Sequence, residues 1–295
     1  MIAVDRLRDF LKNVNPTNFT FLVLTHIMGV WGIVEMSRNP NWRISVAGFA
    51  MFALCGLAIT AGYHRHYAHR SHQASWPVQL LYLVLGAFGV QNKAKIWAAD
   101  HINHHDDPDG KWDNYSIIKG FWWAHIVWVV TKHEPPDLTD PRFEHLVKNK
   151  LVQLQAKYYV HLVVIRFAIA YGLGHLWGNA WGGFLFIGFT ALLLQYHATF
   201  CVNSVAHWLG TRPYDTTISA RDHWLTALIT FGEGYHNFHH TFPSDYRNAI
   251  GKFQWDPTKW LIKVLEKVGL VWDLYRTPDD QIEDARRRAA QLAYA

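Results

Sequence analysis

The stretch ISVAGFAMFALCGLAITAGYHRHYAH, residues 44–69, combines two features that decide the fold. Its first part, from Ile44 to Tyr63, is apolar and contains no charged residue. About 20 such residues span the hydrocarbon core of a bilayer as an α-helix. Its last part places His64 and His69 just beyond the end of that helix. The stretch therefore predicts a membrane span that brings histidines to one membrane surface.

Three further apolar blocks, at about 19–36, 159–177 and 181–200, are also long enough to span a bilayer. The short connections at 37–43 and 178–180 make each consecutive pair of spans a helical hairpin. We therefore predict an all-α integral membrane protein with four transmembrane helices in two hairpins. The rest of its single domain, residues 1–295, forms a histidine-rich helical cap from segments 64–157 and 201–295. Within the cap, the apolar stretches 76–90 and 121–131 predict short helices that lie in the membrane interface or pack under the cap.

The charge distribution predicts which side of the membrane the cap faces. The formal net charge is +5, and the two turns far from the cap hold only Arg38 and Arg43. Because Lys and Arg concentrate in cytoplasmic segments, we expect the cap and both termini to be cytoplasmic. The first 14 residues are expected to form a short amphipathic segment on the same face. No basic run interleaved with aromatic residues is present, so nucleic-acid binding is not expected.

Few reactive or ionisable side chains fall inside the predicted spans. His26 and Arg166 lie well within them and must face the helix bundle, because a charge facing lipid is costly. These ionisable residues occur singly along the sequence, without paired ligand spacing. Cys55 and Cys201 lie in or beside apolar segments, which favours buried thiols over a disulfide framework.

Histidines are clustered in the predicted cap. His236, His239 and His240, in GEGYHNFHHTFP at 232–243, have i, i+3, i+4 spacing, and the same spacing recurs at 101–105. On a helix such side chains share one face, so we expect each triplet to converge on a metal ion. One ion cannot use nine histidine ligands, whereas two ions with four or five ligands each can. The nine expected ligands are His64, His69, His101, His104, His105, His207, His236, His239 and His240.

The spacing of the first pair leaves two possibilities. His64 and His69 are five residues apart, or about 140° around a regular helix. They can reach one metal only if the helix unwinds or bends between them, and otherwise they reach different metals. Imidazole ligands suit iron, zinc and copper about equally. Metal ions at a membrane surface suggest redox work on a lipid, and splitting dioxygen would need a redox-active metal, which favours iron. Asp100, Asp222 and Glu233 flank the clusters as candidate hydrogen-bond acceptors for the ligand imidazoles.

Four motifs together resemble one family. They are HRHYAH at 64–69, DHINHH at 100–105, NSVAH at 203–207 and GEGYHNFHHTFP at 232–243. Their order and spacing are similar to those of the membrane acyl-CoA delta-9 desaturases, the stearoyl-CoA desaturase family. The resemblance covers roughly residues 18–274, and the four-residue gap inside the first motif resembles the delta-9 type.

The resemblance implies an enzyme with two iron ions that uses dioxygen and two electrons. It would remove two hydrogens from a saturated fatty acyl chain of sixteen to eighteen carbons and leave a cis double bond at carbon nine. The nine histidines would then be the metal ligands, and Asn203 would hold a metal-bound water. By the same resemblance, Asn92 and Trp97 would line the acyl tunnel near its bend, and Asn18, Trp128 and Lys132 would lie near the thioester.

Two residues of the second span can be placed from helix geometry. Phe52 and Gly56 lie 12 and 8 residues before His64, which puts them on the order of 12–18 Å from the metals. That depth suits the closed end of a tunnel for the distal half of the acyl chain. Packing between spans is an equally good explanation for both residues.

Several departures from the family pattern leave the carrier of the acyl chain open. Ile118 and Thr131 stand where the family has basic residues. The family's Asp-Pro-His turn is Asp-Asn-Tyr at 113–115, and Phe200 replaces a tunnel tryptophan. Fewer cations would contact the phosphates of coenzyme A. Acyl-CoA is favoured, and acyl carrier protein or phospholipid acyl chains are alternatives.

The sequence also bears on the electron donor and on alternative classes of protein. No haem or iron–sulfur motif is present, and the segment after His240 is short for a fused cytochrome domain. A separate acidic donor of the cytochrome b5, ferredoxin or rubredoxin type is therefore expected on the basic face. A lipid or hydrocarbon hydroxylase could use the same histidines. A metal transporter is a third alternative, but it would place paired ligands inside the spans.

Overall fold

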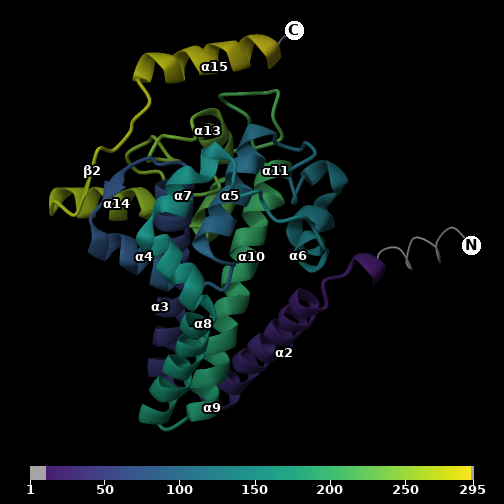
Figure 1. The fold of residues 1–295 in the computed structure, drawn as a ribbon, viewed down its shortest axis with the longest axis vertical. Coiled ribbons are helices and arrows are strands. Elements are labelled where there is room, and N and C mark those ends of the chain that lie inside the picture. Colours follow the sequence, from purple (N-terminus) through teal and green to yellow (C-terminus); the bar gives the residue numbers. More distant parts are fainter. Residues whose placement is uncertain (1–10, 294–295) are drawn as a thin grey trace, which may run out of the picture.

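The computed structural model describes residues 11–293, so most of the expected amphipathic segment at 1–14 and both extreme termini lie outside the described residues. Four long apolar helices confirm the predicted spans. Figure 1 shows them below a cap of short helices, with the two hairpin turns at the end farthest from the cap. The spans are α2 Pro16–Arg38; α3 Trp42–Leu57 continued by the π-helix η1 Ala58–Ala68; α8 Lys150–Leu176; and α9 Ala180–Gly183, η5 Phe184–Thr190 and α10 Ala191–Asn203.

The two hairpin turns are joined by amide side chains. Asn39 and Asn179 both donate to Glu35 Oε1, at 3.1 and 2.9 Å. Asn41 donates to the carbonyl of Trp177 at 2.9 Å and caps the start of α3. Since these bonds link the turn of one hairpin to that of the other, they fix the two hairpins at the end opposite the cap.

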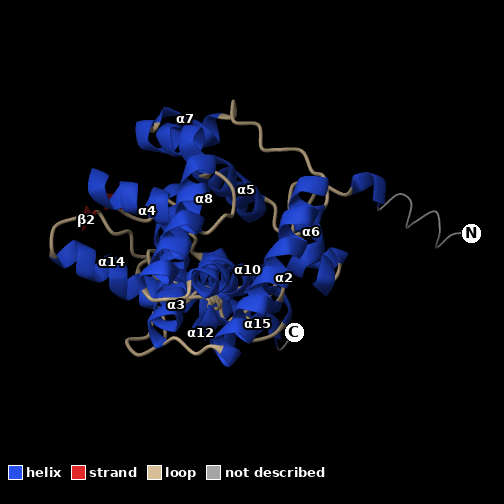
Figure 2. Cartoon of the chain, turned by 90° about the horizontal axis from the view of Figure 1, so that it is seen from below, coloured by secondary structure: helices blue, strands red, loops and turns tan. Residues whose placement is uncertain are grey.

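Small residues allow α2 to pack closely against η5. A Cβ added at Gly32 would lie 2.3 Å from Thr190 Oγ1, which itself donates to the carbonyl of Gly29 at 2.7 Å. Close approach through glycine is typical of helix pairs in membranes, where dispersion contacts replace the hydrophobic effect. Seen from below in Figure 2, α10 lies among α2, α3 and α8.

Arg166 and His26, the two ionisable residues that lie well within the spans, face the bundle, as their cost in lipid requires. Arg166 is buried and donates to the carbonyls of Ile187 and Gly188 in η5. His26 does not stand alone, contrary to the expectation of isolated ionisable groups. Its Nε2 lies 3.1 Å from His197 Nε2, and His197 Nδ1 lies 3.1 Å from His125 Nε2 in the cap. This row of three histidines could not be predicted from the sequence, because its residues come from distant segments.

The cap contains a two-stranded antiparallel sheet, β1 Gln73–Ala74 with β2 Val271–Trp272, which joins the segment after the first histidine pair to the C-terminal region. The final helix is packed rather than peripheral, because Ile282 and Ala285 are buried against Phe238. The cap helices are α4 Trp76–Phe88, α5 Ala94–Asp106, η2 Ile117–Lys119, η3 Trp123–Val127, α6 Trp128–Val130, η4 Pro141–Phe143, α7 Glu144–Lys148, α11 Val205–Trp208, α12 Trp224–Ile229, α13 His236–Thr241, α14 Pro257–Lys267 and α15 Asp279–Ala293.

Candidate metal centre

The end of the second span changes its helical type where the histidines begin. Residues 58–68 form the π-helix η1, and the amide of His69 donates to the carbonyl of His64 at 3.1 Å, five residues back. Such i→i+5 bonding brings residues five apart onto the same face, whereas a regular helix would separate them by about 140°. The two rings are 4.8 Å apart between centroids. Of the two possibilities left by the sequence spacing, the structure thus has the distorted helix, as a π-helix, and both imidazoles reach one site.

The nine predicted histidines form two groups, within each of which the nitrogen atoms lie within 4.8 Å of one another. They come from η1, α5, α11 and α13, and from His69 just past η1. We call the groups the five-histidine cluster and the four-histidine cluster. The first contains His64, His69, His101, His105 and His239, and the second contains His104, His207, His236 and His240.

The expectation that each i, i+3, i+4 triplet converges on one ion is wrong. On α5, His101 and His105 belong to the five-histidine cluster and His104 to the other. On α13, His236 and His240 belong to the four-histidine cluster and His239 to the other. The i and i+4 side chains stay together and the i+3 side chain points to the neighbouring cluster, because successive residues turn by 100°.

The nitrogen spacing inside each cluster matches the coordination sphere of a metal ion. His239 Nε2 lies 2.8 Å from His64 Nε2 and 3.0 Å from His105 Nε2. His236 Nε2 lies 3.1 Å from the Nε2 atoms of both His207 and His240. Imidazole nitrogens about 2.1 Å from one ion, at right angles to each other, stand about 3 Å apart. The clusters therefore fit one ion each.

The protonation of the imidazoles also suits metal binding. Burial, together with the neighbouring imidazoles, holds the pKa values of His101, His105, His236, His239 and His240 well below their usual range. Neutral imidazole is the form that ligates metals. The rings are therefore neutral at physiological pH, with a nitrogen lone pair available for an ion.

Hydrogen bonds on the outer nitrogens orient three of the rings. His64 Nδ1 lies 2.9 Å from Glu233 Oε2, and His104 Nδ1 lies 2.9 Å from Asp113 Oδ2. His207 Nδ1 lies 2.7 Å from Ser219 Oγ. When Nδ1 carries the proton, Nε2 presents its lone pair to the cluster. Each cluster thus contains at least one ring fixed by a carboxylate.

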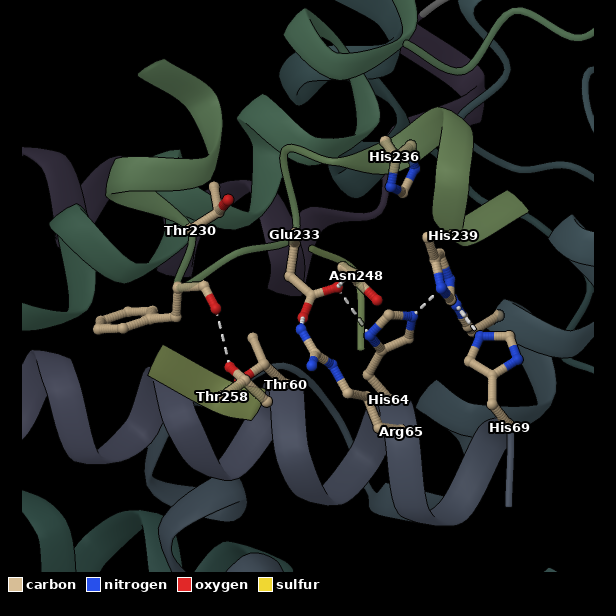
Figure 3. A network of polar contacts seen from close by, with 12 residues as sticks. Thr60, His64, Arg65, His69, Thr230, Glu233, His236, His239, Asn248 and Thr258 are labelled. Atoms are coloured by element: carbon tan, nitrogen blue, oxygen red, sulfur yellow. Dashed lines mark hydrogen bonds and ion pairs between the residues drawn. The ribbon is translucent and has the colours of Figure 1, made fainter. Parts of the chain in front are cut away.

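Glu233 belongs to a buried charge network, drawn in Figure 3 around His64 and Arg65. Arg65 donates to Glu233 at 2.9 Å and to Asp256 at 3.0 Å, and Asn248 donates to Glu233 Oε2 at 2.6 Å. Burial alone would raise the pKa of Glu233, but attraction to His64 and Arg65 outweighs it and lowers the pKa to about 2. The carboxylate is therefore ionised and can hold the proton on His64 Nδ1.

The other two acidic residues proposed as imidazole acceptors have different surroundings. Asp222 accepts from the backbone amides of Asn237 and Phe238, at 2.8 and 3.2 Å, and so caps the start of α13. Asp100 lines a cavity beside the five-histidine cluster. Burial raises the pKa of each to about 7. The bonds observed for Asp222 correct its predicted role, since it positions the helix backbone instead of a ring.

Sequence reasoning missed Asp113, Arg65, Asp256 and Ser219 as parts of this site. Asp113 appeared only as a departure within a turn, and Asp256 lies 20 residues beyond His236 in the chain. Arg65 offered a signal, because a charged residue stands between the histidines of the first motif at the end of an apolar span. Such a residue must find a buried partner or reach the membrane surface.

A cavity of about 650 Å³ adjoins the clusters and runs among α2, α10 and the cap. Its lining includes His64, His101 and His236, and also Asn203. Of the residues expected to contact substrate, Asn18, Asn92, Trp97 and Trp128 line it. Within the lining, Trp97 donates to Gln91 at 3.3 Å and Gln91 donates to Thr199 at 2.9 Å, and the sequence analysis included neither Gln91 nor Thr199.

The remaining three expected substrate residues do not line the cavity. Lys132 donates through Nζ to the carbonyl of Lys12 at 2.9 Å. Phe52 and Gly56 instead pack against Phe231, a cavity-lining residue that the sequence analysis did not single out. Both residues of the second span therefore stand one layer behind the cavity wall.

Four membrane spans, two abutting histidine clusters and an apolar cavity beside them define a multi-pass membrane protein built around paired metal sites. The fatty acid desaturase family model matches residues 40–257. The chain belongs to this family.

Curated relatives agree over nearly the whole chain. Acyl-CoA desaturase 1 of Saccharomyces cerevisiae is 39% identical over 95% of this chain and 55% of its own length. Delta(9)-fatty-acid desaturase fat-7 of Caenorhabditis elegans is 32% identical over 90% of this chain and 80% of its own length. Human stearoyl-CoA desaturase 5 is 32% identical over 94% of this chain and 86% of its own length. The chain spans little more than half the length of the two yeast relatives, at 55% and 58%.

Proposed function

We propose that this chain is a single-domain enzyme that desaturates a saturated fatty acyl chain of sixteen to eighteen carbons, bound as acyl-CoA, at carbon nine. One dioxygen, two electrons and two protons are consumed with the two hydrogens removed from adjacent methylenes. The products are a cis alkene and two water molecules. The observation that carries this proposal is the pair of histidine clusters bordering an apolar cavity, since redox metals and an alkyl chain must meet in such a reaction.

The two clusters would hold two iron ions, one in the five-histidine cluster and one in the four-histidine cluster. When bound, the ions would supply the redox chemistry that activates dioxygen, which protein side chains alone lack. The chain's own residues orient and support that site. Glu233 and Asp113 keep the protons of His64 and His104 on Nδ1, so that the Nε2 lone pairs face inward. Asn203 lines the cavity four residues before His207, where the resemblance assigns it a contact through water.

The cavity positions the alkyl chain and excludes bulk water. We propose that the Trp97–Gln91–Thr199 hydrogen bonds, which connect α5 to α10 in the lining, hold a bend in the cavity. A fixed bend beside the clusters would present one pair of methylenes to the metals, and would favour the cis geometry of the product. Positioning of this kind lowers the barrier because the reacting groups no longer search for each other.

The names of the relatives support the carrier and inform the position of the double bond. Acyl-CoA appears in the names of both yeast relatives, which favours coenzyme A over acyl carrier protein or phospholipid. Two moth relatives, 30% identical, are named Delta(11) desaturases, so the family includes more than one position. We propose position nine because of the four-residue gap inside HRHYAH and the Delta(9) names of the nematode relatives.

We further propose that the cap and both termini face the cytoplasm and receive electrons from a separate acidic protein. Support comes from the turns at the opposite end, which hold only Arg38 and Arg43. Basic side chains of the cap would contact an acidic donor of the cytochrome b5, ferredoxin or rubredoxin type.

Expression in a desaturase-deficient host tests the function directly. Gas chromatography of the host lipids, with double-bond positions assigned by mass spectrometry, should show new cis-9 alkenes. A His239→Ala variant of equal membrane abundance should form none. An alcohol without an alkene would replace desaturation by hydroxylation, and alkenes at another position would correct the regiochemistry. Supplying the acyl chain on coenzyme A, on acyl carrier protein or in phospholipid to purified membranes would identify the carrier.

A further inference from the structure

Phe231 occupies an unusual position in the cavity wall. Its backbone has φ +56°, a left-handed conformation that bulky side chains rarely adopt. Gly232, at φ +106°, and Glu233 follow directly. Thr258 Oγ1 donates to the carbonyl of Phe231 at 2.9 Å and also contacts Thr60 Oγ1 at 2.7 Å, a pairing visible in Figure 3. An aromatic residue is thus held in a disfavoured conformation, immediately beside the carboxylate that orients His64.

The ring of Phe231 lies in a space that only glycine leaves on the second span. A Cβ built at Gly56 would lie 2.2 Å from Phe231 Cε2 and 2.8 Å from Cδ2. Phe52, one turn earlier, contacts the same ring with centroids 5.3 Å apart. Neither span residue lines the cavity, whereas Phe231 does. Any effect of Gly56 or Phe52 on a bound chain must therefore pass through the ring of Phe231.

The ring borders a buried part of the cavity. Its neighbours in the lining, Ile59, Thr60 and Thr230, are all buried, whereas Asn18 and Val160 elsewhere in the lining are exposed. Gly56 lies eight residues before His64, on the order of 12 Å of helix away from the metals. A chain threaded past the clusters into this part of the cavity would contact Phe231.

We propose that Phe231 sets the length of acyl chain that the protein accepts, and that Gly56 sets the position of its ring. This inference rests on the proposed function and assigns its specificity to a residue outside the membrane spans. The terminal methyl of the substrate would contact the ring, and one methylene too many would collide with it. One extra methylene in an apolar pocket typically changes selectivity by about 10-fold to 200-fold.

Opposite changes at the two positions make the proposal testable. Phe231→Ala should enlarge this buried part of the cavity and raise the ratio of longer to shorter alkene products by about tenfold or more. Gly56→Ala should push the ring into the cavity and lower the same ratio. The double variant should behave like Phe231→Ala, because the added methyl then has no ring to displace. Phe49→Ala, on the outer face of the same helix, is the matched control and should keep the parental ratio.

Lipid profiles from the expressing host give the product ratio. Thermal stabilisation of the purified protein by saturated acyl-CoA of graded length gives a second measurement that needs no turnover. Phe231→Leu serves in both assays if Phe231→Ala does not accumulate in membranes. An unchanged length preference in the Phe231 variants, or a shortened preference in the double variant, would overturn the proposal. Absence of alkene from the parental protein would instead refute the proposed function.

Discussion

The imidazole rings of His105 and His240 stack with their centroids 4.1 Å apart, although they belong to different clusters. His105 comes from α5 and His240 from α13, and each of these helices contributes ligands to both clusters. Because the two sites share their supporting helices, a displacement of one helix disturbs both. Each cluster nevertheless has its own carboxylate, Glu233 beside His64 and Asp113 beside His104, so a change at one carboxylate is expected to act first on its own cluster.

The carboxylate of Glu233 should strengthen metal binding at the five-histidine cluster. Glu233→Gln keeps the size of the side chain but removes the charge that holds the proton on His64 Nδ1. We expect metal affinity to fall about 10-fold to 100-fold, as is typical when such an acceptor is lost. Metal retained under a series of chelator concentrations measures the effect. Glu283→Gln, an exposed residue of α15 paired with Arg286, is the control, and equal retention in both variants would contradict the prediction.

Asp113 should act in the same way on the four-histidine cluster. Asp113→Asn weakens the bond that orients His104 and leaves the five-histidine cluster with its own carboxylate. We therefore expect chelator to remove one ion per chain more readily than the other. Elemental analysis after a timed chelator challenge distinguishes this from a uniform loss. Asp137→Asn, on an exposed loop, should match the parental protein. Simultaneous loss of both ions in the Asp113 variant would count against separate sites.

The buried arginine of the first histidine motif should contribute strongly to stability. Arg65→Met leaves the carboxylates of Glu233 and Asp256 buried without their shared cation. Breaking a buried ion pair in this way costs about 3–5 kcal/mol. Arg142 is exposed and pairs with Asp106 and Asp140. Arg142→Met should therefore lower the free energy of unfolding by at most about 1 kcal/mol. Thermal unfolding in detergent compares the two, and similar losses would show that the network does not stabilise the fold.

The close contact between α2 and η5 should tolerate no added methyl group. Gly32→Ala places a Cβ 2.3 Å from Thr190 Oγ1, and overpacking of this kind costs about 1–3 kcal/mol. Adding Thr190→Ala should recover part of the loss. Gly172→Ala, also in a span but with no atom within 4 Å of the new Cβ, should be neutral. Equal unfolding temperatures for the Gly32 and Gly172 variants would contradict the packing described here.

The spans and the ligand residues could be predicted because their signals are local. An uncharged run such as Ile44–Tyr63 or a repeated histidine triplet is visible within a few turns of helix. The division of each triplet between two clusters was not predictable, since it depends on how α5 and α13 face each other. The spacing of His64 and His69 left a distorted helix and two different metals as alternatives, and the π-helix of the structure agrees with the first.

The residues that the sequence analysis missed depend on contacts between distant segments. Asp113 reaches His104 from a turn, and Asp256 reaches Arg65 across 191 positions of sequence. Phe231 has an ordinary sequence context, and only the backbone conformation and the space beside Gly56 reveal its place in the cavity wall. Gly56 was noticed for its depth along the span, but its contact with Phe231 is a tertiary property.

The central claim is that nine imidazoles hold two adjacent ions, and the number of metal ions per chain tests it most directly. Protein purified from an iron-supplemented host and freed of loosely bound metal by gel filtration can be analysed for metal and for protein concentration. The account predicts two ions per folded chain. A folded protein that retains a single ion, or none, would contradict it.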